Sequence, residues 1–185
     1  MYLGGIYVKK LVAMILLAAL LIACLNGCSL MLTFFETDDK IAQAQIDGVL
    51  AALQEEDSDA LKALFSDYTR SSVEDFDRTV EDLFAYYQGK VVSVHDWGMQ
   101  TSKEREGDMT KKDLYLSYDV TTENQGYRLA IHYCATNDYA PEQEGICSLY
   151  IIKMEEDSDP QRAYRGGHIY APGIHIGIPD APLHE

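Results

Sequence analysis

The spacing of apolar residues changes near Gly89 from a helical period to an alternating one, and this change constrains the fold more than any other feature. Before Gly89, apolar side chains recur three and four positions apart, as they do along one face of a helix. After Gly89, apolar and polar residues alternate over short segments, which is typical of strands with one buried face. Helical segments followed by strands indicate an α+β domain, with N-terminal helices packed on an antiparallel sheet of about four strands.

Three helices are expected before Gly89, over residues 38–54, 58–65 and 71–88. Asp57 has a side chain suited to the N-cap of the second helix. Ser71 and Glu74 have the spacing of a capping box, which places the start of the third helix at Ser71. Gly89 suits the position just after that helix, where a glycine commonly ends the last turn.

Four strands are expected after Gly89, over residues 91–99, 114–120, 126–136 and 145–154. The polar segment 101–112 is either a loop or the end of a long hairpin. Near the C-terminus, Ile174, Ile176 and Ile178 alternate with smaller or polar residues. Because prolines flank this segment, we expect a short strand at an edge of the sheet.

A symmetric hairpin between the last two main strands would set Cys134 opposite Cys147. The apolar face of this hairpin, which the helices must cover, would pair Leu129 with Ile152 and Ile131 with Tyr150. One pair argues against this register, since Arg128 would lie opposite Lys153. Opposed cysteines either bond as a disulfide or remain as two small half-buried side chains beside a cavity.

The N-terminal segment has the parts of an export signal. Lys9 and Lys10 precede an apolar run over residues 11–23, and Cys24 and Cys28 follow it. The run has 13 residues, which is too short for the roughly 20 that a spanning helix needs. We therefore expect four parts: a signal peptide (1–27), a lipidated tether (28–37), a single α+β domain (38–178) and a tail (179–185).

The residues before the two cysteines resemble the lipobox of bacterial lipoproteins. Leu21-Ile22-Ala23 precedes Cys24, and Leu25-Asn26-Gly27 precedes Cys28. The resemblance implies that one of the two is lipidated and becomes the mature N-terminus. We favour Cys28, because Gly-Cys-Ser is the commoner ending, and Cys24 is the alternative. The implied location is the outer face of the cytoplasmic membrane, where the lipid anchors the protein.

The charge of the chain limits its partners. The sequence has 15 basic and 30 acidic residues, and cleavage before Cys28 removes two lysines and no carboxylate. The 158 residues that remain suit one domain and carry a formal charge of −17. Such a charge repels nucleic acid and anionic lipid headgroups, so the expected membrane contact is the lipid anchor alone.

Several segments resemble known families. Residues 51–66 resemble the opening of domains with the nuclear-transport-factor-2-like (cystatin-like) fold, which implies helices on the concave side of a curved antiparallel sheet. More narrowly, the chain from about residue 28 to 178 resembles an uncharacterised family of Gram-positive bacterial lipoproteins, classed as a domain of unknown function. The segments that carry this second resemblance are Leu64-Phe65-Ser66, Tyr118 to Thr122, Tyr127-Arg128-Leu129, Gly145 to Tyr150 and Pro172-Gly173-Ile174. None of these motifs is catalytic, so the resemblance implies architecture and location only.

Candidates for general acid–base chemistry are few. Enzymes of this fold place a base in a pocket between sheet and helices, and the groups available for it are His95, Asp96, Asp119 and His132. A His–Asp pair such as His132 and Asp119 would serve if the two side chains converge. The acidic segments 55–59 and 155–159 lack the glycine and terminal glutamate of a calcium loop, so we expect no metal. No cofactor motif is present.

Three functions are consistent with these features. The first is a non-catalytic binding or accessory domain whose ligand is a protein or a small molecule. The alternative is a small pocket enzyme, such as an isomerase or hydrolase, that uses one of the candidate bases. The third is a structural partner that forms a homodimer through its open sheet face.

Overall fold

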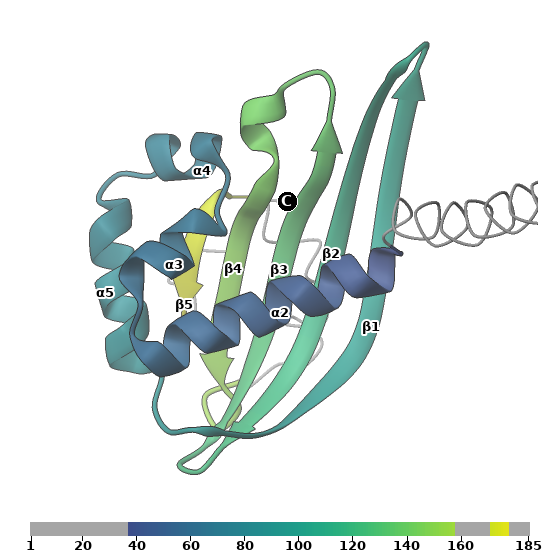
Figure 1. Ribbon diagram of the computed structural model, residues 1–185. Helices are drawn as coiled ribbons and strands as arrows, with labels where there is room; N and C mark the ends of the chain where they lie inside the picture. The colour runs from purple at the N-terminus through teal and green to yellow at the C-terminus, as the bar shows by residue number, and fades with distance from the viewer. Residues whose placement is uncertain (1–36, 158–170, 178–185) are drawn as a thin grey trace, which may run out of the picture. The chain divides into compact units, whose positions relative to one another are not determined.

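A computed structural model describes residues 37–157 and 171–177 (Figure 1). The predicted signal peptide, the tether up to residue 36 and the tail at 179–185 lie outside the described residues, as do Cys24 and Cys28. The domain is mixed α+β, as predicted, and within the two described ranges its open sheet has five strands, which are the four main strands expected and the expected edge strand. Within the described residues, no helix is both long enough and apolar enough to span a membrane.

Within residues 37–157, four helices precede the sheet: α2 (Asp38–Glu55), α3 (Ser58–Ala63), α4 (Asp67–Ser72) and α5 (Phe76–Tyr86). The first two confirm the predicted helices, and the Asp57 carboxylate caps α3 by accepting a hydrogen bond from the Ala60 N–H at 2.9 Å. The expected third helix was wrong at its start. Its counterpart α5 has Asp75, not Ser71, at the N-cap, and Ser66 caps the separate short helix α4 by accepting a hydrogen bond from the Thr69 N–H. Ser71 lies near the end of α4, where its hydroxyl donates to the Tyr68 carbonyl.

The strands are β1 (Val91–Glu106), β2 (Met109–Thr122), β3 (Gly126–Asn137), β4 (Gly145–Lys153) and β5 (Gly173–Ile176), hydrogen-bonded in that order. The polar segment 101–112 forms the end of a long β1–β2 hairpin that turns at Gly107, which has a φ of +61°. A 3₁₀ turn, η1 (Pro141–Gln143), lies in the connection between β3 and β4. The predicted edge strand is confirmed as β5, although it pairs with β4 in parallel.

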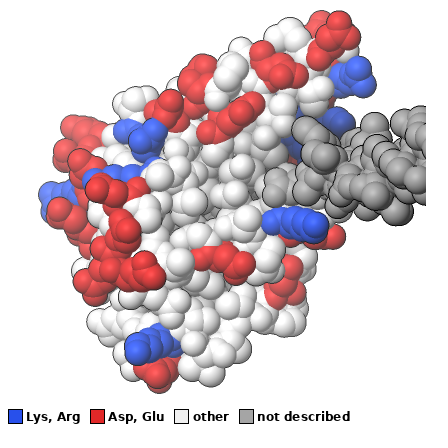
Figure 2. All heavy atoms as spheres, in the orientation of Figure 1, with Lys and Arg blue, Asp and Glu red and all other residues white. Residues whose placement is uncertain are grey.

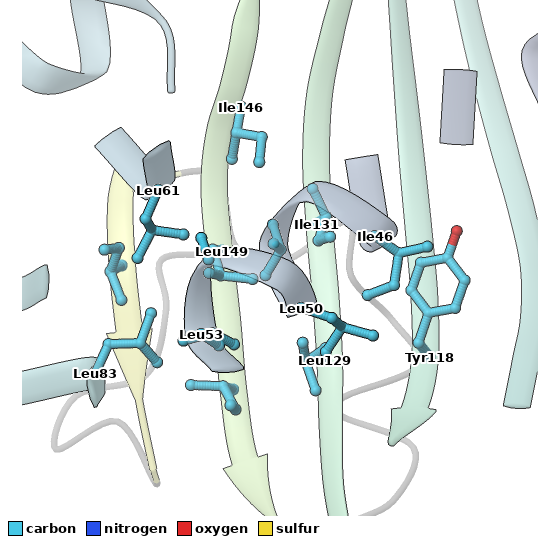
Figure 3. Packing of buried hydrophobic residues seen from close by; sticks show 14 of the residues in the cluster. Ile46, Leu50, Leu53, Leu61, Leu83, Tyr118, Leu129, Ile131, Ile146 and Leu149 are labelled. Atoms are coloured by element: carbon cyan, nitrogen blue, oxygen red, sulfur yellow. The ribbon is translucent and has the colours of Figure 1, made fainter. Parts of the chain in front are cut away.

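The helices lie on one face of the sheet, and α2 crosses it (Figure 1). Apolar side chains fill the space between the two layers (Figure 3). Ile46 and Leu53 of α2, at 1% and 3% exposure, are in the same cluster as Leu129 and Leu149 of the sheet, which have no exposed surface. This layer is the core of the domain, and burial of its apolar surface is the dominant favourable contribution to folding.

The predicted register of the β3–β4 hairpin is wrong by one residue. Leu129 pairs with Ile151 and Ile131 pairs with Leu149, so the even-numbered neighbours in β4 lie on the opposite face. This register removes the like-charged pair, because Arg128 now lies opposite Ile152. Tyr150 and Ile152 form a small separate cluster with Ala130.

A β-bulge interrupts the same hairpin. His132 pairs with Ser148 but Tyr133 pairs with Ile146, which leaves Cys147 as an extra residue in β4. Beyond the bulge, Cys134 lies opposite Gly145 rather than opposite Cys147. A bulge allows two consecutive side chains to leave the core face, and so it re-aims the side chain at Cys147.

Candidate functional site

The sheet face opposite the helices carries a cluster of polar and sulfur-bearing side chains. Its members are Asp113 and Tyr115 of β2, His132 and Cys134 of β3, and Cys147 of β4, and we call it the thiol–histidine cluster. The β2–β3 register brings four of them together by setting Asp113 opposite Cys134 and Tyr115 opposite His132. Cys147 joins them through the bulge, since its thiol and that of Cys134 are hydrogen-bonded to each other.

His132 is held between a carboxylate and an aromatic ring. Its Nε2 lies 3.0 Å from Oδ1 of Asp113, and both side chains are largely buried. The Tyr115 ring stacks on the imidazole at 4.7 Å between centroids, with 16° between the ring planes. These two contacts fix the position and the orientation of the imidazole.

Asp113 is an almost fully buried carboxylate with two cationic or polar neighbours. Burial raises the pKa of the Asp113 carboxyl, but the hydrogen bond and the charge of His132, with that of Lys111, outweigh it and hold this pKa below its ordinary value. Lys111 Nζ lies 3.4 Å from the Asp113 carboxylate. Asp113 therefore remains ionised beside His132 at neutral pH.

The two thiols differ in their environments. The hydrogen bond to Cys147, together with burial, raises the pKa of Cys134. For Cys147 the hydrogen bond from Cys134 outweighs burial, and with the charge of His132 it lowers the thiol pKa to about 7. Both cysteines are free thiols in this structure, Cys134 buried and Cys147 half-buried.

Residues 64–69 hold the bulge at Cys147 from the helical side. The Thr69 hydroxyl donates to the Cys147 carbonyl at 3.1 Å and accepts a hydrogen bond from the Ser66 hydroxyl at 2.9 Å. Beside this contact, Ile146 pairs with the chain before α4: its N–H donates to the Leu64 carbonyl and its carbonyl accepts from the Ser66 N–H. Gly145 has a φ of +121° and passes so close to Ser66 that a Cβ would lie 2.8 Å from its backbone nitrogen.

The sequence-predicted pair His132 and Asp119 is not formed. Asp119 instead binds Arg128, with Nε and Nη2 of the guanidinium 2.9 and 3.3 Å from its two oxygens. Arg128 also binds Asp157 at 2.6 Å. This carboxylate–guanidinium group lies on the same sheet face as the thiol–histidine cluster, but farther along β2 from His132. Asp113 and Asp119 lie on the same face of β2, because side chains alternate along a strand. The β2–β3 register therefore decides which of them lies near His132.

The other two predicted candidates lie on the exposed edge strand β1. His95 pairs with Asp119 across the β1–β2 ladder, and its ring packs edge-on against Trp97 at 4.5 Å. The Asp96 carboxylate accepts a hydrogen bond from the Gly98 N–H at 2.7 Å, at a bulge in β1. His132 lies opposite Tyr115, four residues along β2 from Asp119, so the four predicted residues do not form one site.

Among the described residues, surface hollows border the helices and the hairpin. One, of about 550 Å³, lies between the end of the β1–β2 hairpin and η1, and we call it the hairpin hollow. It is lined by Glu104, Arg105, Glu106, Lys111, Asn137, Tyr139, Ala140 and Gln143. A second, of about 740 Å³, lies among α3, α4 and α5 and has charged side chains of both signs. Figure 2 shows the face of the domain that carries the helices, where acidic side chains outnumber basic ones.

No group of three or more His, Cys, Asp or Glu side chains in the described ranges could hold a metal ion. The cluster has the elements of thiol chemistry instead: a thiol of lowered pKa, a second thiol bonded to it, and an imidazole fixed by a carboxylate.

The match to a known family covers this whole region. Residues 48–154 match the family described as a domain of unknown function, DUF5104. The chain belongs to this family. The DUF5104 region begins within α2 and ends just after β4, so it includes every member of the thiol–histidine cluster and the contacts that hold the bulge. No curated protein matches the chain.

Proposed function

We propose that this protein is a lipid-anchored extracytoplasmic domain that binds a ligand or assists a partner without catalysis. The observation that carries the proposal is the N-terminal segment: Lys9 and Lys10, the apolar run 11–23, and Cys28 after Leu-Asn-Gly, with Cys24 as the alternative. A diacylated cysteine would tether the domain to the outer face of the cytoplasmic membrane. The mature charge of −17 supports a need for that tether, since the domain itself would be repelled by anionic lipid.

The position of the hairpin hollow at the surface supports a binding role. Buried apolar side chains fill the layer between helices and sheet, which is where enzymes with a nuclear-transport-factor-2-like fold have their pocket. The hairpin hollow is instead at the surface, and it combines the exposed Tyr139 ring with Arg105, Lys111 and two amide side chains. Such a mixture suits a small polar ligand or a peptide segment, because it offers both ring contact and hydrogen bonds.

We also assign the fold to the nuclear-transport-factor-2-like (cystatin-like) class and the chain to Gram-positive lipoproteins. Helices packed on one face of an open, mainly antiparallel sheet support the fold assignment, and the cysteines that follow the apolar run support the lipoprotein assignment.

Fractionation of cells that produce the full chain tests the anchoring. We expect the protein in the membrane fraction, accessible to protease added outside the cell. Cys28→Ala should release it to the soluble fraction or leave it as an uncleaved precursor, whereas Cys24→Ala, the matched control, should change neither. Equal behaviour of wild type and both variants would show that no lipid on these cysteines anchors the chain.

One observation favours the alternative, a small enzyme. His132 and Asp113 form a hydrogen-bonded pair at 3.0 Å, and Cys147 lies close enough to His132 for its thiol to feel the imidazole charge. A hydrolase could use Cys147 as nucleophile and His132 as base. Turnover of a chromogenic ester that Cys147→Ala abolishes and Cys134→Ala preserves would support this reading over the binding domain.

A further inference from the structure

The two thiols of the thiol–histidine cluster are placed asymmetrically. Cys134 is 1% exposed and lies within β3, opposite Gly145. Cys147 is half-buried and occupies the extra position of the bulge in β4. The bulge brings the thiol of Cys147 into hydrogen-bond contact with that of Cys134, although the two residues are not paired in the ladder. Of the two, only Cys147 offers a reagent access without opening the sheet.

The surroundings of Cys147 connect it to the hairpin hollow. Its Sγ lies 3.7 Å from the carbonyl oxygen of Gln143, and Gln143 also lines the hollow. Lys111 lines the same hollow and binds Asp113, the carboxylate that holds His132. The volume of about 550 Å³ is within the range that accommodates small molecules. Cys147 does not itself line the hollow, and Gln143 lies between it and a solute bound there.

The charges around the pair favour a thiolate at one cysteine. The hydrogen bond with Cys134 and the charge of His132 lower the pKa of Cys147, while the same hydrogen bond and burial raise the pKa of Cys134. A thiolate is the nucleophile in exchange with disulfides, and the attack is fastest when the pKa is near the ambient pH.

We propose that Cys134 and Cys147 form a reactive dithiol pair for exchange with low-molecular-weight disulfides, with Cys147 as the attacking thiol and Cys134 as the resolving thiol. The inference does not depend on the lipid anchor or on the ligand of the binding domain. It assigns chemistry to the sheet face that carries the bulge at Cys147. Residues 64–69 hold this bulge in place.

The reaction balances with a disulfide R–S–S–R as the oxidant. Sγ of Cys147 attacks one sulfur of R–S–S–R, so a mixed disulfide forms at Cys147 and the first R–S⁻ leaves with the proton that Cys147 lost. Cys134 then loses its proton and attacks Sγ of Cys147, which releases the second R–S⁻ to take that proton. The two cysteines are oxidised by two electrons to a disulfide, and R–S–S–R is reduced to two thiols.

The test uses the reduced full chain, purified in detergent, with oxidised glutathione as the probe. In the wild type we expect a Cys134–Cys147 disulfide by non-reducing peptide mapping, with little mixed disulfide. Cys134→Ser should accumulate glutathione at Cys147, because the resolving thiol is absent. Cys147→Ser should react at Cys134 at least about tenfold more slowly, because that thiol is buried and its pKa is raised. Comparable rates for the two variants would overturn the proposal.

Two further measurements cover the case in which a variant fails to fold. Iodoacetamide applied to the native reduced wild type should modify Cys147 at least about tenfold faster than Cys134. Dithiothreitol should reduce the oxidised wild type under native conditions, so that the pair cycles between the two states. Preferred alkylation of Cys134 would overturn the assignment of Cys147 as the attacking thiol. A disulfide that is reduced only after unfolding would indicate a static structural bond.

Discussion

The hydroxyl of Thr69 donates a hydrogen bond to the backbone carbonyl of Cys147, with 3.1 Å between the two oxygens. These residues are 78 positions apart, and the bond joins the short helix α4 to the bulge in β4. Thr69 is fully buried, and its hydroxyl also accepts a hydrogen bond from Ser66, the N-cap of α4. A single side chain thus links the helix cap to the position of the half-buried thiol.

Replacement of Thr69 by the isosteric valine should destabilise the domain. The Cys147 carbonyl and the Ser66 hydroxyl would both lose a buried partner, at a cost of about 1–3 kcal/mol in the free energy of unfolding. Thr79→Val is the matched control, because the Thr79 hydroxyl donates to the Phe76 carbonyl within α5, and it should stay within about 0.5 kcal/mol of wild type. Urea denaturation measures the free energy of unfolding of both variants. Equal losses would show that the Thr69 hydrogen bond stabilises the domain no more than the Thr79 hydrogen bond does.

A side chain at position 145 should destabilise the domain more than one at position 107. Gly145→Ala combines a φ of +121° with a Cβ only 2.8 Å from the Ser66 nitrogen, so we expect a loss of about 3 kcal/mol or more. Gly107→Ala also has a positive φ, +61°, but no atom within 4 Å of its Cβ, and should cost about 1 kcal/mol. Thermal and urea unfolding of the two variants gives the comparison. A smaller loss at Gly145 than at Gly107 would contradict the close approach to Ser66.

The alkylation rate of Cys147 should follow pH with a midpoint of about 7, below the ordinary thiol value of 9. Cys134→Ala removes the hydrogen bond that is the main cause of the lowered pKa, so it should move the midpoint upward. His132→Gln should move it in the same direction by a smaller amount. Rates with iodoacetamide across pH 5 to 10 supply the measurement. An unchanged midpoint in both variants would show that Cys134 and His132 do not cause the lowered pKa of Cys147.

Ionised Asp113 should stabilise the folded domain above pH 4 and lose that effect in acid. Because its folded pKa lies below the ordinary value of 3.8, the contribution is present above 3.8 and disappears as the pH falls through the folded pKa. Asp113→Asn should therefore be less stable than wild type at pH 7, and the difference in unfolding free energy should narrow below pH 3.8. Urea denaturation at a series of pH values tests this, and parallel curves for the two proteins would be inconsistent with it.

Local signals predicted the elements that local chemistry controls. Asp57 begins α3 because its carboxylate lies three residues before a free N–H, and this spacing can be seen in the sequence. Ser66 has the same spacing to Thr69, yet Ser71 and Glu74 offered an equally plausible cap. The main helix α5 begins only after the left-handed Asp75, and its residues Phe76, Val80 and Leu83 pack in the core.

The site was harder to predict because distant contacts determine its register. A symmetric hairpin pairs Cys134 with Cys147, but the contacts of residues 64–69 with Ile146 and Cys147 impose a bulge there. The bulge shifts the pairing so that the two thiols meet by hydrogen bond rather than by direct opposition. Asp113 was missed for a related reason, since only the β2–β3 register shows that it, and not Asp119, reaches His132.

The intact mass of protein extracted from membranes tests most directly the proposed lipid anchor on a cysteine of the N-terminal segment. We expect the mature chain to begin at Cys28, or at Cys24 in the alternative, with a diacylglyceryl group on that residue. A chain that begins at Met1 and carries no lipid on either cysteine would contradict the account.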